Sequence, residues 1–88
     1  MTKITITSDV LFQALDNEAV LLHLPTEKYF GLNEVGSQMW QLLEAGSSME
    51  DTISSIMAEY EVEEEMVRRD IAELVSQLAE QELIQIEV

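Results

Sequence analysis

The chain has 88 residues, a net charge of −14 and no cysteine. This length predicts one small domain spanning residues 1–88, and the lack of cysteine excludes disulfides, thiolate metal sites and thiol catalysis. The acidic charge is concentrated in residues 46–88, which carry 2 basic and 12 acidic side chains. We therefore expect no nucleic-acid partner and no anionic membrane as a partner, and we favour a basic one. No apolar run reaches the ~18 residues of a membrane span and no signal peptide is evident, so we expect a cytoplasmic protein.

The first third of the chain has the pattern of short strands. Turn-forming residues at Asp16-Asn17 and at Pro25 separate three segments, at 12–15, 18–24 and 28–32. Asp and Asn tolerate the positive φ that a two-residue hairpin turn requires, and Pro fixes φ at a turn corner. Two consecutive tight turns predict an antiparallel meander whose last strand, 28–32, has one free edge.

The remainder of the chain has the spacing of three helices. Asn33 and Ser48 can cap the first two, because their side-chain oxygens accept first-turn N–H groups, and Gly46 can end the first. The third helix is expected at about 64–81 and has an apolar stripe of Val67, Ile71, Leu74, Val75 and Leu78. The last residues, 83–88, form either an extended tail or a strand that returns to residues 3–7.

Strands followed by helices predict an α+β fold, with a small antiparallel three-stranded sheet followed by three helices. Three short helices with turns between them also fit a winged helix-turn-helix. A transcription regulator of that fold would need Lys and Arg on its recognition helix. The third helix has only Arg68 and Arg69 against five acidic residues. The charge therefore disfavours a DNA-binding role.

Few residues of the chain could support catalysis or metal binding. We therefore expect that the protein is not an enzyme and binds no metal and no cofactor. His23 is the only histidine, and one histidine without cysteine makes a poor metal site, so we expect a strand residue at the sheet surface. No serine lies in a nucleophile turn, and no glycine-rich phosphate loop is present. The acidic run at 59–65 suits a solvated loop and helix start, where acidic side chains favour the positive end of the helix dipole. An anionic rim that attracts a basic peptide is the second interpretation, and both can hold at once.

The strand at 28–32 has the features of a docking edge. Tyr29 and Phe30 are adjacent, so one faces the core and the other faces solvent or a partner. The strand has no proline, and its only charge is Lys28 at its start. Nothing in it blocks the addition of a peptide strand.

The segment 23–43 resembles the PqqD-like family. It contains the sequence Tyr-Phe-Gly-Leu-Asn at 29–33, followed by Gly36 and Trp40. The apolar positions of the later helices are similar to the second half of that family. The resemblance implies a precursor-peptide recognition element with a winged helix-turn-helix fold. Such proteins bind the leader of a ribosomally made precursor as an extra strand, between the third strand of the sheet and the third helix.

Among the members of this family, the sequence looks most like the stand-alone leader-binding protein of lasso-peptide biosynthesis. The resemblance then implies a leader protease as a partner and a cyclase in the same maturation. The peptide chaperone of pyrroloquinoline-quinone biosynthesis is the close alternative. The resemblance, carried over position by position, implies peptide-binding residues on the strand and on the third helix. Those on the strand are Lys28, Tyr29, Phe30, Gly31 and Leu32, and those on the helix are Glu64, Val67, Asp70, Ile71 and Leu74. Some of the helical residues are expected to belong to the core instead.

One position departs from the family pattern. The family often has Gly at the end of the third helix, where this chain has Glu82. A residue other than Gly in the left-handed conformation costs about 1 kcal/mol. We therefore expect the third helix to end in a different backbone conformation from that of the family. This difference would change the geometry of the tail and leave the groove unchanged.

Overall fold

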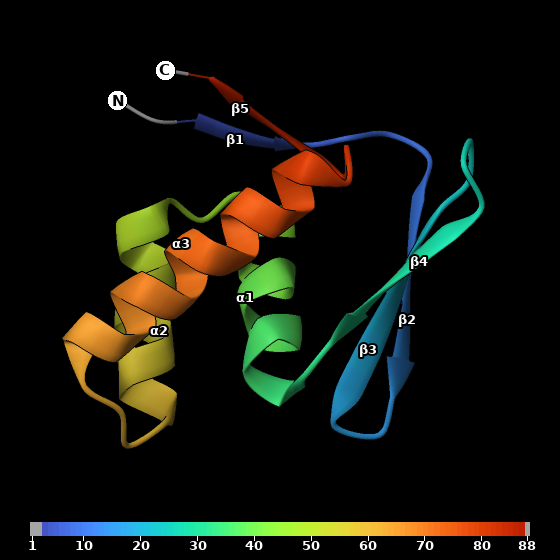
Figure 1. Ribbon diagram of the computed structural model, residues 1–88. Coiled ribbons are helices and arrows are strands. Elements are labelled where there is room, and N and C mark those ends of the chain that lie inside the picture. Colours follow the sequence, from blue (N-terminus) through green and yellow to red (C-terminus); the bar gives the residue numbers. More distant parts are fainter. Residues whose placement is uncertain (1–2, 88) are drawn as a thin grey trace.

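The computed structural model describes residues 3–87. Within this range the elements are β1 (Lys3–Ile6), β2 (Val10–Leu15), β3 (Glu18–His23), β4 (Lys28–Leu32), α1 (Glu34–Glu44), α2 (Met49–Glu59), α3 (Glu64–Glu80) and β5 (Ile84–Glu87). The order of strands and then three helices confirms the predicted α+β fold (Figure 1). None of the helices in this range is long and apolar enough to cross a membrane.

Strands β2, β3 and β4 form the predicted antiparallel meander, with β2 and β4 at its edges. The turn between β2 and β3 consists of Asp16 and Asn17, and Asp16 takes the positive φ of 56° that a two-residue turn needs. The turn between β3 and β4 is closed by the N–H of Glu27, which donates to the carbonyl of His23 at 2.8 Å. Local turn chemistry therefore fixes the register of all three strands.

The meander has one buried face and one exposed face. Ala19, Leu21 and His23 alternate along β3 and are buried, and they stand opposite Leu32, Phe30 and Lys28 of β4. His23 therefore lies on the inner face, which corrects the expectation that it lies at the sheet surface. Its Nδ1 is 2.8 Å from the Thr26 hydroxyl, so the imidazole completes the turn between β3 and β4.

The helices begin where the sequence predicts. The Asn33 side chain accepts the N–H of Gly36 at 2.7 Å, and the Ser48 hydroxyl accepts the N–H of Asp51 at 3.0 Å. α1 lies at the centre of the molecule, between the meander and α2, while α3 crosses beside both helices (Figure 1). The core forms where these elements meet, and its largest fully buried side chains include Leu21, Met39, Trp40, Ile56, Ile71 and Leu78.

The segment after α3 is a strand that returns to the start of the chain. β5 pairs antiparallel with β1, with Ile86 opposite Ile4, and Val88 lies outside the described residues. Before this strand, Glu82 takes a φ of 61°. The expectation that α3 ends without a left-handed residue is therefore wrong. Leu83 and Ile84 are buried directly after Glu82, and burying them requires the chain to turn sharply at this position.

Candidate functional site

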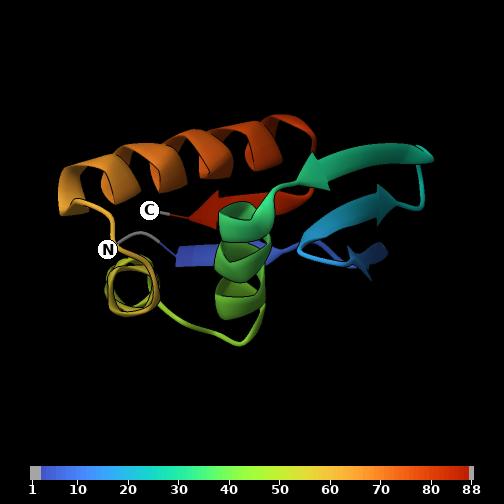
Figure 2. The same ribbon diagram turned by 90° about the horizontal axis from the view of Figure 1, so that it is seen from below.

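A groove lies between β4 and α3, and the first half of α1 forms its floor. Figure 2 places α3 and β4 on the same side of α1. Every Cα of β4 is more than 8 Å from every Cα of α3. Neighbouring strands in a sheet lie about 4.8 Å apart. This separation exceeds the spacing of paired strands, so α3 does not occupy the position beside β4 that an added strand would take.

The groove has a volume of about 300 Å³ and a mixed chemical character. Its apolar walls and floor come from Phe30, Leu32, Val35, Met39 and Leu74, with Gly31, Asn33, Gly36, Asp70, Glu73 and Gln77 completing the lining. The charged members, both acidic, come from α3. This arrangement suits an extended chain that buries apolar side chains against the floor and presents a basic side chain toward α3.

The groove side and the core side of α3 are separated by helical periodicity. Residues three and four positions apart share one helix face, so Asp70, Glu73, Leu74 and Gln77 line the groove together. Val67, Ile71, Val75 and Leu78 belong to the adjacent stripe of the helix and are buried in the core. The stripe that stabilises the fold and the stripe that lines the groove are therefore different sets of residues.

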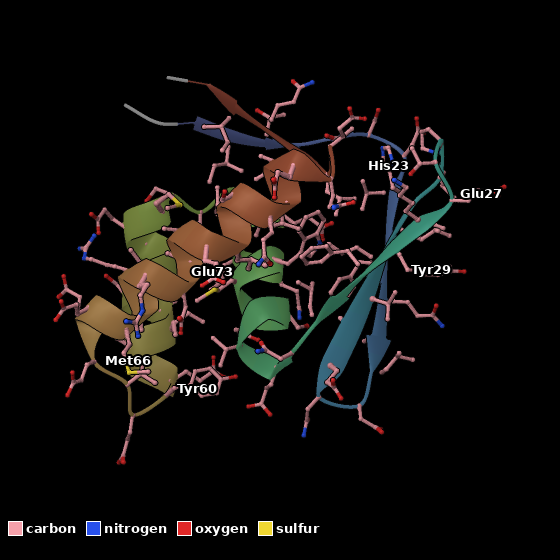
Figure 3. The ribbon with its side chains drawn as sticks, in the orientation of Figure 1. His23, Glu27, Tyr29, Tyr60, Met66 and Glu73 are labelled. Carbon is pink, nitrogen blue, oxygen red and sulfur yellow. The ribbon has the colours of Figure 1, made fainter. Side chains whose placement is uncertain are left out.

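The structure brings half of the ten predicted site residues together in the groove: Phe30, Gly31, Leu32, Asp70 and Leu74. Val67 and Ile71 lie in the core. Lys28 and Tyr29 belong to β4 and do not line the groove. The Tyr29 side chain points away from the helices (Figure 3).

Glu64 lies in the first turn of α3 and is held in an ion-pair network. Arg68 donates from Nε to Glu64 at 2.7 Å, and from its two terminal nitrogens to both carboxylate oxygens of Glu50 at 3.0 and 2.8 Å. The hydrogen bonds to Glu50 and Glu64 raise the pKa of Arg68, and the bond from Arg68 lowers the pKa of the Glu50 carboxyl. Glu64 thus helps to tie the start of α2 to α3.

Sequence reasoning missed six residues of the lining: Asn33, Val35, Gly36, Met39, Glu73 and Gln77. Helical spacing from Asp70 indicates Glu73 and Gln77, which lie three and seven positions further on. Asn33, Val35, Gly36 and Met39 follow the edge strand β4 directly in the chain. This position next to the edge strand is the sequence feature that could have indicated them as groove residues. A Cβ at Gly36 would lie 3.2 Å from the capping oxygen of Asn33, so glycine leaves room for both the cap and the groove floor.

Comparison with known proteins identifies the family. The family model described as Coenzyme PQQ synthesis protein D (PqqD) matches residues 18–84. The chain belongs to the PqqD family. The matched span contains β4, α1 and α3, so the PqqD match covers both walls and the floor of the groove. This confirms the resemblance seen in the sequence. No curated protein matches the chain.

Two solved structures are similar to this PqqD-family chain. The structure of TbiB1 in complex with the TbiA(beta) leader peptide has 43% identity and a TM-score of 0.86, and the match covers 92% of this chain and 94% of that one. The structure of a lasso peptide synthetase B1 complexed with the leader peptide has 30% identity and a TM-score of 0.84, with 94% and 98% covered. Both similar proteins are leader-peptide complexes.

Proposed function

We propose that this chain is a non-catalytic protein that binds the leader segment of a ribosomally synthesised precursor, as a strand added to β4. The observation that carries the proposal is the edge of β4, which borders the groove and has no Cα of α3 within 8 Å. Strand addition provides affinity through main-chain hydrogen bonds and specificity through pockets for alternate side chains. The two similar structures, which hold leader peptides, support the same role.

The groove-facing side chains of the leader are anchored mainly by apolar contact. Phe30 and Leu74 are half-buried on opposite walls, and Met39 is buried in the floor between them. Burial of one Leu-sized side chain there is worth about 1.5–3 kcal/mol. An ion pair at the rim is worth about 0–1 kcal/mol. Apolar pockets therefore account for more of the affinity than charge does.

Charge selects for basic residues in the leader. Asp70 and Glu73 line the groove from α3, and the whole chain has a net charge of −14. The acidic run at 63–65 opens α3 and does not line the groove. The leader therefore carries Lys or Arg at a position that faces Asp70 and Glu73. Opposite charges at such a rim mainly accelerate encounter.

The bound leader is presented to a leader protease, with a cyclase acting in the same lasso-peptide maturation. The identity of 43% to TbiB1 and 30% to a lasso peptide synthetase B1 supports this pathway. We place the step in the cytoplasm, where the ribosome makes the precursor. The second candidate, a peptide chaperone of pyrroloquinoline-quinone biosynthesis, is supported by the description of the family model. Titration with a lasso-peptide precursor and, separately, with a pyrroloquinoline-quinone precursor distinguishes the two candidate functions.

The experiment that tests the function is an anisotropy titration with a fluorescein-labelled synthetic TbiA(beta) leader peptide, the peptide bound in the similar TbiB1 structure. Gly31→Pro removes a backbone N–H from β4 and restricts φ, so we expect Kd to rise at least tenfold. Gly31→Ala is the matched control, because it keeps the N–H and its Cβ meets no atom within 4 Å.

A Gly31→Pro variant that is folded by circular dichroism and binds with unchanged Kd would place the peptide elsewhere. Leaders that carry a single backbone N-methyl group test the same main-chain pairing on the unmodified protein. Methylation at alternate positions should weaken binding at one set and leave the other set unaffected.

A further inference from the structure

Strand β2 is an edge strand that lacks the features by which proteins protect such edges. Its residues, Val10–Leu15, include no charged side chain and no proline, although 25% of the whole chain is charged. Its only neighbour in the sheet is β3, and no other helix or strand within residues 3–87 has a Cα within 8 Å of it. An uncovered edge of this kind pairs with a further strand unless charge, proline or a covering segment prevents the pairing.

The backbone groups on the free side of β2 belong to alternate residues. The N–H of Leu24 donates to the carbonyl of Asp9 at 3.0 Å, and such bonded pairs recur at every second residue of an antiparallel ladder. The odd-numbered residues of β2 therefore bond to β3, while Val10, Phe12 and Ala14 direct their N–H and C=O groups outward. In the part of the chain that the structure describes, these outward groups have no hydrogen-bond partner.

The free edge of β2 lies far from most of the acidic charge. Residues 46–88 carry 12 of the 18 acidic side chains, and Figure 1 shows α2 and α3 on the opposite side of α1 from β2. The molecule extends 36 Å along its longest axis. Contact through β2 therefore separates the acidic helices of two copies by more than one Debye length, which is about 8 Å in physiological salt.

We propose that two copies of this chain associate through β2 and form one continuous antiparallel sheet across a two-fold axis. Two identical strands in antiparallel pairing are self-complementary, so the outward N–H and C=O groups of each copy find partners in the other. The dimer needs no leader. It also leaves the leader groove free in both copies, because β4 is the opposite edge of the meander.

Charge opposes this association and gives it a characteristic salt dependence. Each copy has a net charge of −14, and Asp9 and Asp16 flank β2 at its two ends. Salt screens the repulsion between these charges and leaves the main-chain hydrogen bonds in place. We therefore expect the dimer Kd to fall when the salt concentration is raised from 0.05 M to 0.5 M.

The test compares two substitutions at Ala14 by sedimentation equilibrium. Ala14→Pro removes an outward N–H and leaves the bonds from β2 to β3 in place, and proline is tolerated at such positions of edge strands. Ala14→Thr is the matched control, because it keeps the N–H and suits a strand. We expect Ala14→Pro to raise the dimer Kd at least tenfold and Ala14→Thr to change it less than twofold.

Hydrogen exchange of the wild-type protein tests the same contact without a variant. The amides of Phe12 and Ala14 should gain protection as the protein concentration rises. Those of Leu11 and Gln13, which already bond to β3, should exchange at an unchanged rate. Saturation with the TbiA(beta) leader, the peptide of the similar TbiB1 structure, should leave the dimer Kd unchanged, because the leader occupies the other edge of the sheet.

A wild-type protein that stays monomeric at millimolar concentration in 0.5 M salt would overturn the inference, as would a folded Ala14→Pro variant that dimerises like the wild type. Pairing of β2 with β4 of another copy would produce open polymers. Polymers that the leader dissociates would therefore also overturn it. Failure of the protein to bind any leader would remove the proposed function, and the sedimentation and exchange results would still decide the dimer.

Discussion

Glu82 follows α3 in the same backbone arrangement in which Gly46 follows α1. Gly46 has φ 97° and Glu82 has φ 61°. In both cases this residue donates its N–H to the carbonyl three residues back, at 3.1 Å, and the next residue donates to the carbonyl five back, at 3.0 Å after α1 and 2.9 Å after α3. This is the Schellman arrangement, which favours glycine at the left-handed position. A glutamate therefore occupies a glycine position at the end of α3.

The conformation of Glu82 makes Glu82→Gly a stabilising change. Glycine removes the steric cost of the left-handed conformation, and its greater freedom in the unfolded chain offsets part of that gain. We expect the free energy of unfolding to rise by about 0.5–1 kcal/mol, measured by urea denaturation. Glu82→Gln is the control, because it removes the charge and keeps the strain. Gly46→Ala should have the opposite effect, and equal stability of Glu82→Gly and wild type would show that the position carries no strain.

Leu74→Ala should weaken leader binding by removing one apolar wall of the groove. Leu74 is half-buried and lines the groove, and a Leu-sized contact worth about 1.5–3 kcal/mol corresponds to a rise in Kd of roughly 10- to 100-fold. Anisotropy titration measures the change. Met66→Ala, on the same helix and outside the groove, should leave Kd unchanged. Equal effects of the two substitutions would exclude α3 as a groove wall.

Asp70→Asn/Glu73→Gln should lower the association rate of a basic leader and leave its dissociation rate nearly unchanged. Both carboxylates line the groove, and rim charges act mainly on encounter. We expect a decrease of about tenfold or less in stopped-flow experiments, larger in 0.05 M salt than in 0.5 M salt.

The matched control is Glu61→Gln/Glu65→Gln, which removes the same charge from exposed positions outside the groove. A similar loss in both double variants would assign the effect to net charge. A faster association of the Asp70→Asn/Glu73→Gln variant would contradict a basic leader.

Glu50→Gln should destabilise the protein at neutral pH and have less effect in acid. The hydrogen bond from Arg68 lowers the Glu50 pKa below its ordinary value of 4.5. A carboxyl with a lowered folded-state pKa contributes stability above its unfolded pKa and loses it as the pH falls through the folded pKa. The difference in urea midpoint between variant and wild type should therefore shrink from pH 7 toward pH 3. Glu61→Gln, which removes a charge without breaking this pair, should not destabilise the protein at pH 7.

The sequence by itself determined the features that depend on neighbours in the chain. Asn33 and Ser48 cap their helices through atoms three residues away, and Asp16-Asn17 closes a two-residue turn. These interactions form within one turn of the chain, so their residue types identify them directly. The apolar stripes predicted α1, α2 and α3 for the same reason, because a helix places residues three and four positions apart on one face.

Only the tertiary structure decided which side of each element faces the groove. Val67 and Ile71 have the same apolar character as Leu74, and the position of α1 beneath α3 assigns the first two to the core and Leu74 to the groove. Glu64 belongs to an ion-pair network because Glu50, on another helix, brings its carboxylate to the same arginine. Glu82 accepts the left-handed conformation because burial of Leu83 and Ile84, and the pairing of β5 with β1, require the chain to turn there. Each of these outcomes depends on contacts between elements far apart in the chain. Residue spacing along a single element shows which residues share a face, but it does not show what that face contacts.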